Sequence, residues 1–264
     1  MAKHTLQRGE PAVLFSGGID SVLVAACAHR VLPIDQTIQL VNVSFAGPEA
    51  PDRVAGELAL EELRQAFPTR EFNFTRVDVD LSEVKRDELE IVQHMFPKTT
   101  VMDFNLSAVL WFSSKHCGVG VRVLISGVGA DELCGGYARH KTQYERHGLD
   151  ALRQELAMDV NRLWLRNFGR DDRAVAAFGR ELRMPFVDSD VMHVVQTSPI
   201  HDLMSFSPKN QGDKLVLRRI MCELGLGDTA KRTKRAAQFG SRMAKLIQPA
   251  CAGTDPFVVG HTLL

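Results

Sequence analysis

The chain contains 264 residues, 45% of them hydrophobic and 24% charged, a balance typical of soluble globular proteins. Its 32 basic and 32 acidic residues cancel, which argues against a nucleic-acid partner, because proteins that wrap a duplex usually carry a basic excess. Five cysteines without zinc-type spacing, no membrane-length apolar run and no signal-peptide core together predict a cytoplasmic protein with no membrane partner.

Strands and helices are predicted to alternate through the first half of the chain. The predicted strands cover residues 12–15, 38–45, 72–80 and 121–126, and the predicted helices cover 20–31, 52–67, 81–96 and 105–116. Within these helices, Leu58, Leu63 and Phe67 should face the sheet, and Ser82 should cap the helix that begins beside it. This alternation predicts an α/β fold with a parallel, doubly wound sheet.

The second half has helical periodicity and no convincing strand between Glu132 and Leu226, which predicts an α-helical subdomain beside the sheet. The expected organisation is an N-terminal extension (1–10), a nucleotide-binding core (11–131), the helical subdomain (132–248) and an irregular tail (249–264). One helix, 152–168, carries an apolar stripe of Leu152, Leu156, Leu163, Trp164 and Phe168. Such stripes usually face a core, but an exposed Trp164 would favour a partner-binding surface.

The stretch LFSGGIDSV (14–22) joins the first predicted strand to the first predicted helix, at the sheet edge where α/β proteins bind ligands. Donors for a phosphate would come from Ser16, Gly17, Gly18 and Ser21. The lysine of a Walker loop is missing, and Asp20 would repel a phosphate unless a divalent cation lay between them, so Asp20 favours Mg²⁺. The alternative is a tight turn in which Asp20 caps the helix.

A second stretch, SGVGADELCGGYARH (126–140), follows another predicted strand and also delivers acidic residues after glycines. Its candidate ligand-binding residues are Ser126, Gly127, Gly129 and Asp131. Two such turns could hold one metal–polyphosphate from both sides. Close packing or a helix kink is the alternative explanation for Gly135 and Gly136.

These two motifs, SGGxDS and SGxGADExxGGYxRH, resemble the synthetase domain of the glutamine-dependent asparagine synthetases, within the ATP-pyrophosphatase (PP-loop) group. Residues 169–188 resemble that family's segment ending in ExRxPFLD, and residues 212–219 (GDKLVLRR) resemble its KxxLR helix. Residues 234–242 (KRAAQFGSR) resemble the asparagine synthetase domain-containing proteins, a eukaryotic branch. The resemblance covers about residues 11 to 245 and implies an adenine nucleotide alpha hydrolase-like sheet followed by the helical subdomain.

The resemblance implies an ATP-dependent amide ligase, in which a carboxylate, with aspartate expected, attacks the α-phosphorus of ATP and ammonia then displaces AMP. By motif position, Ser16, Gly17, Gly18, Asp20 and Ser21 would bind pyrophosphate, and Asp20 and Asp131 would hold Mg²⁺. Lys214 would stabilise the α-phosphate, with Lys214 and Asp131 as the catalytic residues; the alternative for Lys214 is a solvated helix lysine. Arg183 matches the family's ExRxPFLD segment, and the alternative is that it forms a structural ion pair with Glu181.

The chain departs from active asparagine synthetases at three places. Ala2 rather than a cysteine follows Met1 and about ten residues precede the first strand, so we expect no glutaminase half, and ammonia from solution or from a separate glutaminase. Val128 replaces a glutamate credited with deprotonating ammonium, and Met102, in TTVMD, replaces an arginine of TTxRA. Asp103 is no equivalent, because its charge is opposite.

Three hypotheses therefore stand. The first is an ATP-dependent ligase, favoured by Lys214, Asp20 and Asp131. The second is a nucleotide-binding pseudoenzyme that acts through a protein partner, favoured by Val128 and Met102. The third is another PP-loop chemistry such as tRNA modification, and the neutral charge and the lack of cysteine pairs count against it.

Overall fold

The computed structural model describes residues 10–206, 212–233, 236–246 and 255–257. Five strands form one sheet in which every neighbouring pair is parallel, in the order β3-β2-β1-β4-β5. They are β1 (Glu10–Leu14), β2 (Ile38–Ser44), β3 (Phe72–Asp78), β4 (Val121–Ile125) and β5 (Glu181–Arg183). The predicted α/β class and the parallel, doubly wound sheet are confirmed.

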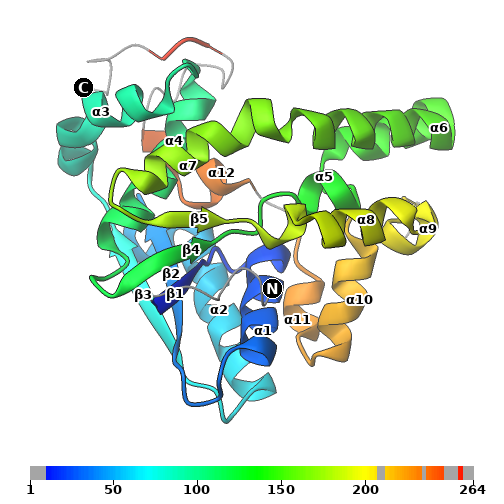
Figure 1. The fold of residues 1–264 in the computed structure, drawn as a ribbon, viewed down its shortest axis with the longest axis horizontal. Helices are drawn as coiled ribbons and strands as arrows, with labels where there is room; N and C mark the ends of the chain where they lie inside the picture. Colours follow the sequence, from blue (N-terminus) through cyan, green and yellow to red (C-terminus); the bar gives the residue numbers. More distant parts are fainter. Residues whose placement is uncertain (1–9, 207–211, 234–235, 247–254, 258–264) are drawn as a thin grey trace.

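Helices cover both faces of the sheet, as parallel strands require (Figure 1). One face packs against α1 (Ile19–Val31), α2 (Pro51–Ala66), α10 (Leu215–Glu223) and α11 (Gly227–Ala230). The other face packs against α3 (Leu81–Met95), α4 (Val101–His116), α7 (Gly169–Ala176) and α13 (Met243–Leu246). Each face buries its own apolar cluster, so the sheet forms the rigid centre on which the loops at its carboxyl edge are mounted.

The remaining elements gather beside and above that edge (Figure 1). They are α5 (Ala130–Cys134), the long α6 (Ala138–Leu163), a π-helical turn (Trp164–Phe168), α8 (Ser189–Thr197), α9 (Ile200–Leu203) and α12 (Ala237–Gly240), with short 3₁₀ turns at Gly47–Glu49 and Pro185–Val187. A small apolar cluster of Leu152, Leu203, Met204 and Phe206 joins α6 to α9.

The expectation of no strand after residue 132 is wrong. β5 pairs with β4 through Val123, Leu124 and Ile125 and extends the sheet by one strand. Leu182 is the buried residue of this three-residue strand, whereas Glu181 is exposed and Arg183 is half-buried. A strand this short and this charged leaves no period-two apolar pattern in the sequence.

Three local details also differ from the sequence prediction. Asp80, not Ser82, caps α3: its carboxylate accepts the N–H of Glu83 at 2.8 Å, while the Ser82 hydroxyl donates to the same carboxylate. Leu58 points to solvent on α2, whereas Leu63 is fully buried as predicted. The helix expected to begin at residue 105 begins at Val101.

Trp164 is 65% exposed, although the apolar stripe of 152–168 placed it with core residues. Leu152 and Leu163 of that stripe are buried. The α-helical hydrogen-bond pattern ends at Leu163, and the following π-helical turn, with its wider spacing, changes the direction in which later side chains point. The stripe therefore predicts the core only as far as the α-helical geometry continues.

The domain boundaries proposed from the sequence stay a prediction. Most of the expected extension (1–10) and most of the expected tail (249–264) lie outside the described residues.

Candidate active site

The first glycine turn connects β1 to α1 and is held in a compact form. The Ser21 hydroxyl donates to the Gly18 carbonyl at 3.0 Å, and the Ser16 hydroxyl lies 3.3 Å from that of Ser21. Gly17 has φ +75°, and a Cβ there would lie 2.3 Å from the backbone of Ala55 in α2. Only glycine fits both that backbone angle and that short distance to α2. The turn is therefore held in one conformation, with the first N–H groups of α1 directed past the carboxyl end of β1.

The second glycine turn, after β4, lies directly against the first. A Cβ on Gly127 would lie 2.7 Å from the Cβ of Asp20, so the backbone of one turn touches the side chain of the other. Gly129, with φ +99°, approaches Val187 in the same way, and the Ser126 N–H donates to the Arg183 carbonyl at 2.8 Å. The segment 181–187 therefore packs against this turn and holds its backbone in place.

Lys214 joins the two turns. Its Nζ lies 2.6 Å from Oδ2 and 2.8 Å from Oδ1 of Asp20, and 2.7 Å from Oδ1 of Asp131. The lysine is 1% exposed and adopts φ +55° immediately before α10. Burial alone would lower the pKa of its ammonium, but the charges of Asp20 and Asp131 outweigh burial and raise that pKa. The structure thus brings together side chains from three distant segments, with Lys214 and Asp20 lying 194 positions apart in the chain.

Gly136 makes room for this cluster. A Cβ at this position would lie 1.9 Å from Oδ1 of Asp131 and 2.5 Å from Cε of Lys214. Close packing, which the sequence offered as an alternative for Gly135 and Gly136, is therefore part of the site itself.

Asp20 and Asp131 suit a Mg²⁺ ion that is also held by phosphate. Their carboxylates face one point, now taken by the Lys214 ammonium, and oxygen ligands are the kind that Mg²⁺ prefers. Among the described residues, no group of three or more His, Cys, Asp or Glu side chains could hold a metal on its own. The donor set therefore fits an ion bound through one or two carboxylates together with a ligand's oxygens.

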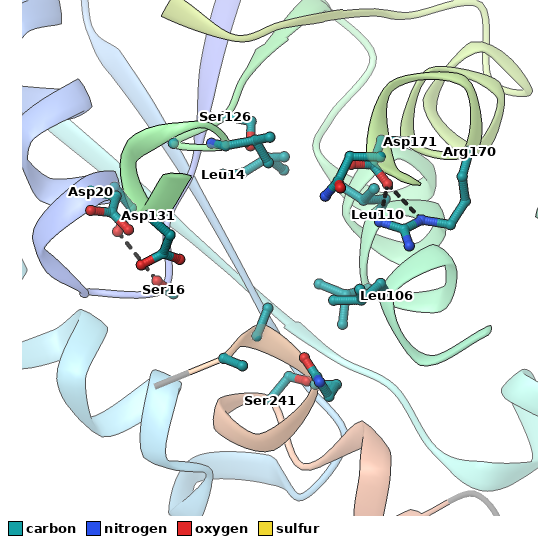
Figure 2. Close-up of a pocket in the computed structure, with 18 of the residues that line it drawn as sticks. Leu14, Ser16, Asp20, Leu106, Leu110, Ser126, Asp131, Arg170, Asp171 and Ser241 are labelled. Carbon is teal, nitrogen blue, oxygen red and sulfur yellow. Dashed lines mark hydrogen bonds and ion pairs between the residues drawn. The ribbon is translucent and has the colours of Figure 1, made fainter. Parts of the chain in front are cut away.

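A cavity of about 510 Å³ opens at these turns. Six of the predicted residues line it, namely Ser16, Asp20, Ser21, Ser126, Gly127 and Asp131. Gly17, Gly18, Gly129 and Lys214 are not lining residues: the glycines belong to the two turns, and Lys214 contacts the lining residues Asp20 and Asp131. Val128 and Met102, two of the three departures from active synthetases, also line it. Figure 2 shows Ser16, Asp20 and Asp131 on one side, with Leu106 and Leu110 of α4 on the opposite side.

A buried ion cluster forms the far end of the cavity. The Arg170 guanidinium lies 2.8 Å from Oδ1 of Asp103 in α4. It also lies 2.7 Å from Oδ1 of Asp171, and Figure 2 labels both residues of this second pair. Both side chains of the Arg170–Asp171 pair are less than 5% exposed. Burial raises the pKa of the Asp171 carboxyl in spite of its arginine partner.

A third wall of the cavity comes from α5 and α6. The Tyr137 hydroxyl donates to Oε1 of the buried Glu132 at 2.6 Å, and burial raises the pKa values of both groups. Asp159 forms an ion pair with Arg139, and its Oδ2 lies 2.8 Å from Nε2 of His140. Burial lowers the pKa of His140.

Sequence reasoning missed several residues that shape the site. Arg232 donates to the carbonyls of Gly17 and Ala55, each at 2.7 Å, and so fastens the first glycine turn to α2. Asn42 donates to the Phe15 carbonyl at 2.8 Å. These contacts join segments that are distant in the chain, and no local sequence pattern predicts them. Arg183 forms the ion pair with Glu181 that the sequence left open, at 2.9 Å.

Comparisons with known proteins agree with this geometry. The family model described as asparagine synthase matches residues 1–150 and 143–251. The chain belongs to the asparagine synthase family. The resemblance stated from the motifs is confirmed.

Within this family, the chain is similar both to asparagine synthetase domain-containing proteins and to a glutamine-hydrolyzing asparagine synthetase. It is 35% identical to asparagine synthetase domain-containing protein 1 of Mus musculus over 89% of this chain and 46% of the relative, and 32% identical to that of Homo sapiens over 91% and 46%. It is 29% identical to asparagine synthetase [glutamine-hydrolyzing] 1 of Arabidopsis thaliana over 78% and 35%. The chain spans about half the length of the domain-containing relatives it matches.

Membership of this family makes ATP a compatible ligand. No helix in the described part of the chain combines the length and the apolar character needed to cross a bilayer.

Proposed function

We propose that this chain is an ATP-dependent ligase of the asparagine synthetase type, which adenylates a carboxylate, aspartate in the first instance, and passes the acyl group to ammonia. The observation that carries this proposal is the buried Lys214 ammonium facing Asp20 and Asp131 where the two glycine turns meet. A buried lysine between two carboxylates, beside a helix N-terminus, is an arrangement suited to polyphosphate chemistry.

The first step would join a carboxylate oxygen to the α-phosphorus of ATP and break the bond from that phosphorus to the bridging oxygen, so that pyrophosphate leaves. Ser16, Ser21 and the N–H groups at the start of α1 would bind the leaving pyrophosphate. Lys214 would move from its carboxylate partners to the α-phosphoryl oxygens. Mg²⁺, held by Asp20 and Asp131, would neutralise charge on the phosphate oxygens.

In the second step, the nitrogen of ammonia would bond to the carbonyl carbon, the bond from that carbon to the AMP oxygen would break, and the nitrogen would pass a proton to water. Val128 lines the cavity but has no group that accepts a proton. Ammonia would therefore have to arrive unprotonated, from solution or from a separate glutaminase.

The second candidate function is a nucleotide-binding protein that acts through a partner. Trp164 is 65% exposed and the adjacent Leu165 is 52% exposed, on the turn whose next residues, Arg166 and Asn167, line the cavity. An exposed tryptophan beside a leucine is the kind of surface that a protein partner covers.

ATP–pyrophosphate exchange with Mg²⁺ and a panel of amino acids, aspartate first, separates the two functions. The ligase predicts exchange that requires a carboxylate and falls to background in Lys214→Ala and Asp131→Ala. Lys231→Ala is the matched control, since this lysine is 73% exposed at the surface, and it should keep exchange. ATP binding without exchange for any amino acid would contradict the ligase and favour the partner-binding function.

A further inference from the structure

The turn between α3 and α4 brings Lys98 to the cavity. Its backbone N–H donates to the Met95 carbonyl at 2.9 Å. Just beyond it, the Thr99 carbonyl accepts the N–H of Phe257 at 2.7 Å, and the Val101 N–H donates to the Asp255 carbonyl at 2.8 Å. The backbone on both sides of Lys98 is therefore fixed, and its half-buried side chain lines the cavity.

Among the basic side chains that line the cavity, Lys98 is the one that has no carboxylate partner in the described part of the chain. Four basic side chains line the cavity there, namely Lys98, Arg139, Arg166 and Arg170. Arg170 is held by Asp103 and Asp171, and the other two arginines both contact Asp159. An arginine neutralised by buried carboxylates offers little attraction to a further anion.

The cation that already serves the two glycine turns limits what Lys98 would bind. Asp103, in the first turn of the helix that follows Lys98, contacts Arg170, and Figure 2 places Arg170 across the cavity from Asp20 and Asp131. A pyrophosphate bound at the glycine turns would therefore already have its own cation, Lys214, on the other side of the cavity. Lys98, which lines the same cavity, is therefore left for another anionic group of a ligand.

From this distribution of charge we propose that Lys98 binds a second carboxylate of the substrate that is adenylated, and so selects substrates that carry one carboxylate to react and another to anchor. The inference rests on the proposed ligase function. Met102, which lines the same wall, offers no charge for this task, and Lys98 supplies it from four positions earlier in the chain. Because Lys98 is half-buried, an anionic ligand would also relieve the cost of keeping an ammonium partly out of water.

The test compares Lys98→Met with the wild-type chain in ATP–pyrophosphate exchange. The methionine variant should raise KM for aspartate by about tenfold or more, since a hydrogen bond to a charged group is worth at least that factor, and leave KM for ATP nearly unchanged. Lys98→Arg should restore much of the aspartate affinity. Lys85→Met is the matched control, because Lys85 is exposed on α3 and does not line the cavity. An unchanged KM for aspartate, or a rise in KM for ATP alone, would overturn the inference.

A binding measurement separates failure of this inference from failure of the proposed function. Calorimetry would compare a sulfamoyl analogue of β-aspartyl-adenylate with the 3-aminobutanoyl analogue, which has a methyl group in place of the free carboxylate, and it needs no turnover. The wild-type chain should bind the aspartyl compound about tenfold more tightly, and Lys98→Met should abolish that preference. A wild-type chain that does not distinguish the two analogues would overturn the role of Lys98, whether or not exchange is observed.

Discussion

The two ends of the cavity are built in different ways. At the end where we propose that phosphate binds, here called the phosphate end, Asp20 and Asp131 lie in the first turns of the helices that follow the two glycine turns, and they share a single lysine. At the far end, Asp103 and Arg170 lie 67 positions apart on two helices, and their charges neutralise each other within a buried pair. Backbone geometry therefore defines the first end, and side-chain ion pairing defines the second.

This difference has a chemical consequence. The carboxylates of the phosphate end remain about one-fifth to one-quarter exposed and line the cavity, so they are accessible from it. Arg170 and Asp171 are less than 5% exposed and contact each other directly, so their charges act on the packing of α4 against α7. One end keeps its carboxylates accessible from the cavity, and the other holds two helices together.

The strongest test of the backbone-defined end is Gly17→Ala. We expect it to lower the free energy of unfolding by about 4 kcal/mol, because the left-handed angle costs about 1–2 kcal/mol and the new Cβ must also push the backbone of Ala55 away. Gly47→Ala is the matched control: Gly47 has φ +59°, but a Cβ there would meet no atom within 4 Å, so about 1 kcal/mol is expected. Equal losses in urea unfolding would mean that the contact with α2 contributes nothing.

The ion-paired end should respond to Arg170→Met. Removing this guanidinium leaves Asp103 and Asp171 buried without their shared cation, which should destabilise the fold by about 3 kcal/mol. The comparison is Arg76→Met, since Arg76 makes a 2.6 Å pair with Glu57 but is half-exposed, and its loss should cost less than about 1 kcal/mol. If urea unfolding gives the two variants similar losses, the buried cluster does not hold α4 and α7 together.

The sequence predicted much of the geometry of the phosphate end because backbone conformation defines that end. Gly17, Gly18 and the residues around them need particular backbone conformations, and such requirements appear as short local patterns such as SGGIDS. Lys214 was found through a family motif, since nothing local marks it as buried between two acids.

The far end could not be found in this way. Asp103 and Arg170 meet only when α4 packs against α7, and Arg232 meets Gly17 only when the segment after α11 reaches α2. β5 is similarly invisible, because its three residues become a strand through pairing with β4 rather than through their own propensity. Contacts of this kind depend on the completed fold.

The Lys214 cluster predicts a pH dependence at the phosphate end. Because the native pKa of Lys214 is raised above its ordinary value of 10.5, its stabilising effect is complete below pH 10.5 and is lost as pH rises through the native pKa. Lys214→Met should cost about 2 kcal/mol at pH 8, less than a fully buried pair because Asp20 and Asp131 reach solvent, and the difference from wild type should shrink by pH 11.

The control for this experiment removes the partners. In an Asp20→Asn, Asp131→Asn background, the ammonium has no carboxylates to raise its pKa, so the effect of Lys214→Met on urea unfolding should no longer decrease between pH 8 and pH 11 in the same way. A wild-type difference that is constant over this range would contradict the ion-paired geometry.

The smallest effect is expected at Trp164, beside the cavity wall formed by Leu163. Trp164→Ala should change the free energy of unfolding by less than about 0.5 kcal/mol, because 65% of the side chain already contacts solvent. Leu163→Ala, one residue earlier and 3% exposed, should cost about 2 kcal/mol or more. Two adjacent apolar residues should thus differ several-fold in urea unfolding, because the π-helical turn begins between them. A comparable loss at both would place the indole in the core, as the helical stripe alone predicts, and would remove the exposed surface that favours a protein partner.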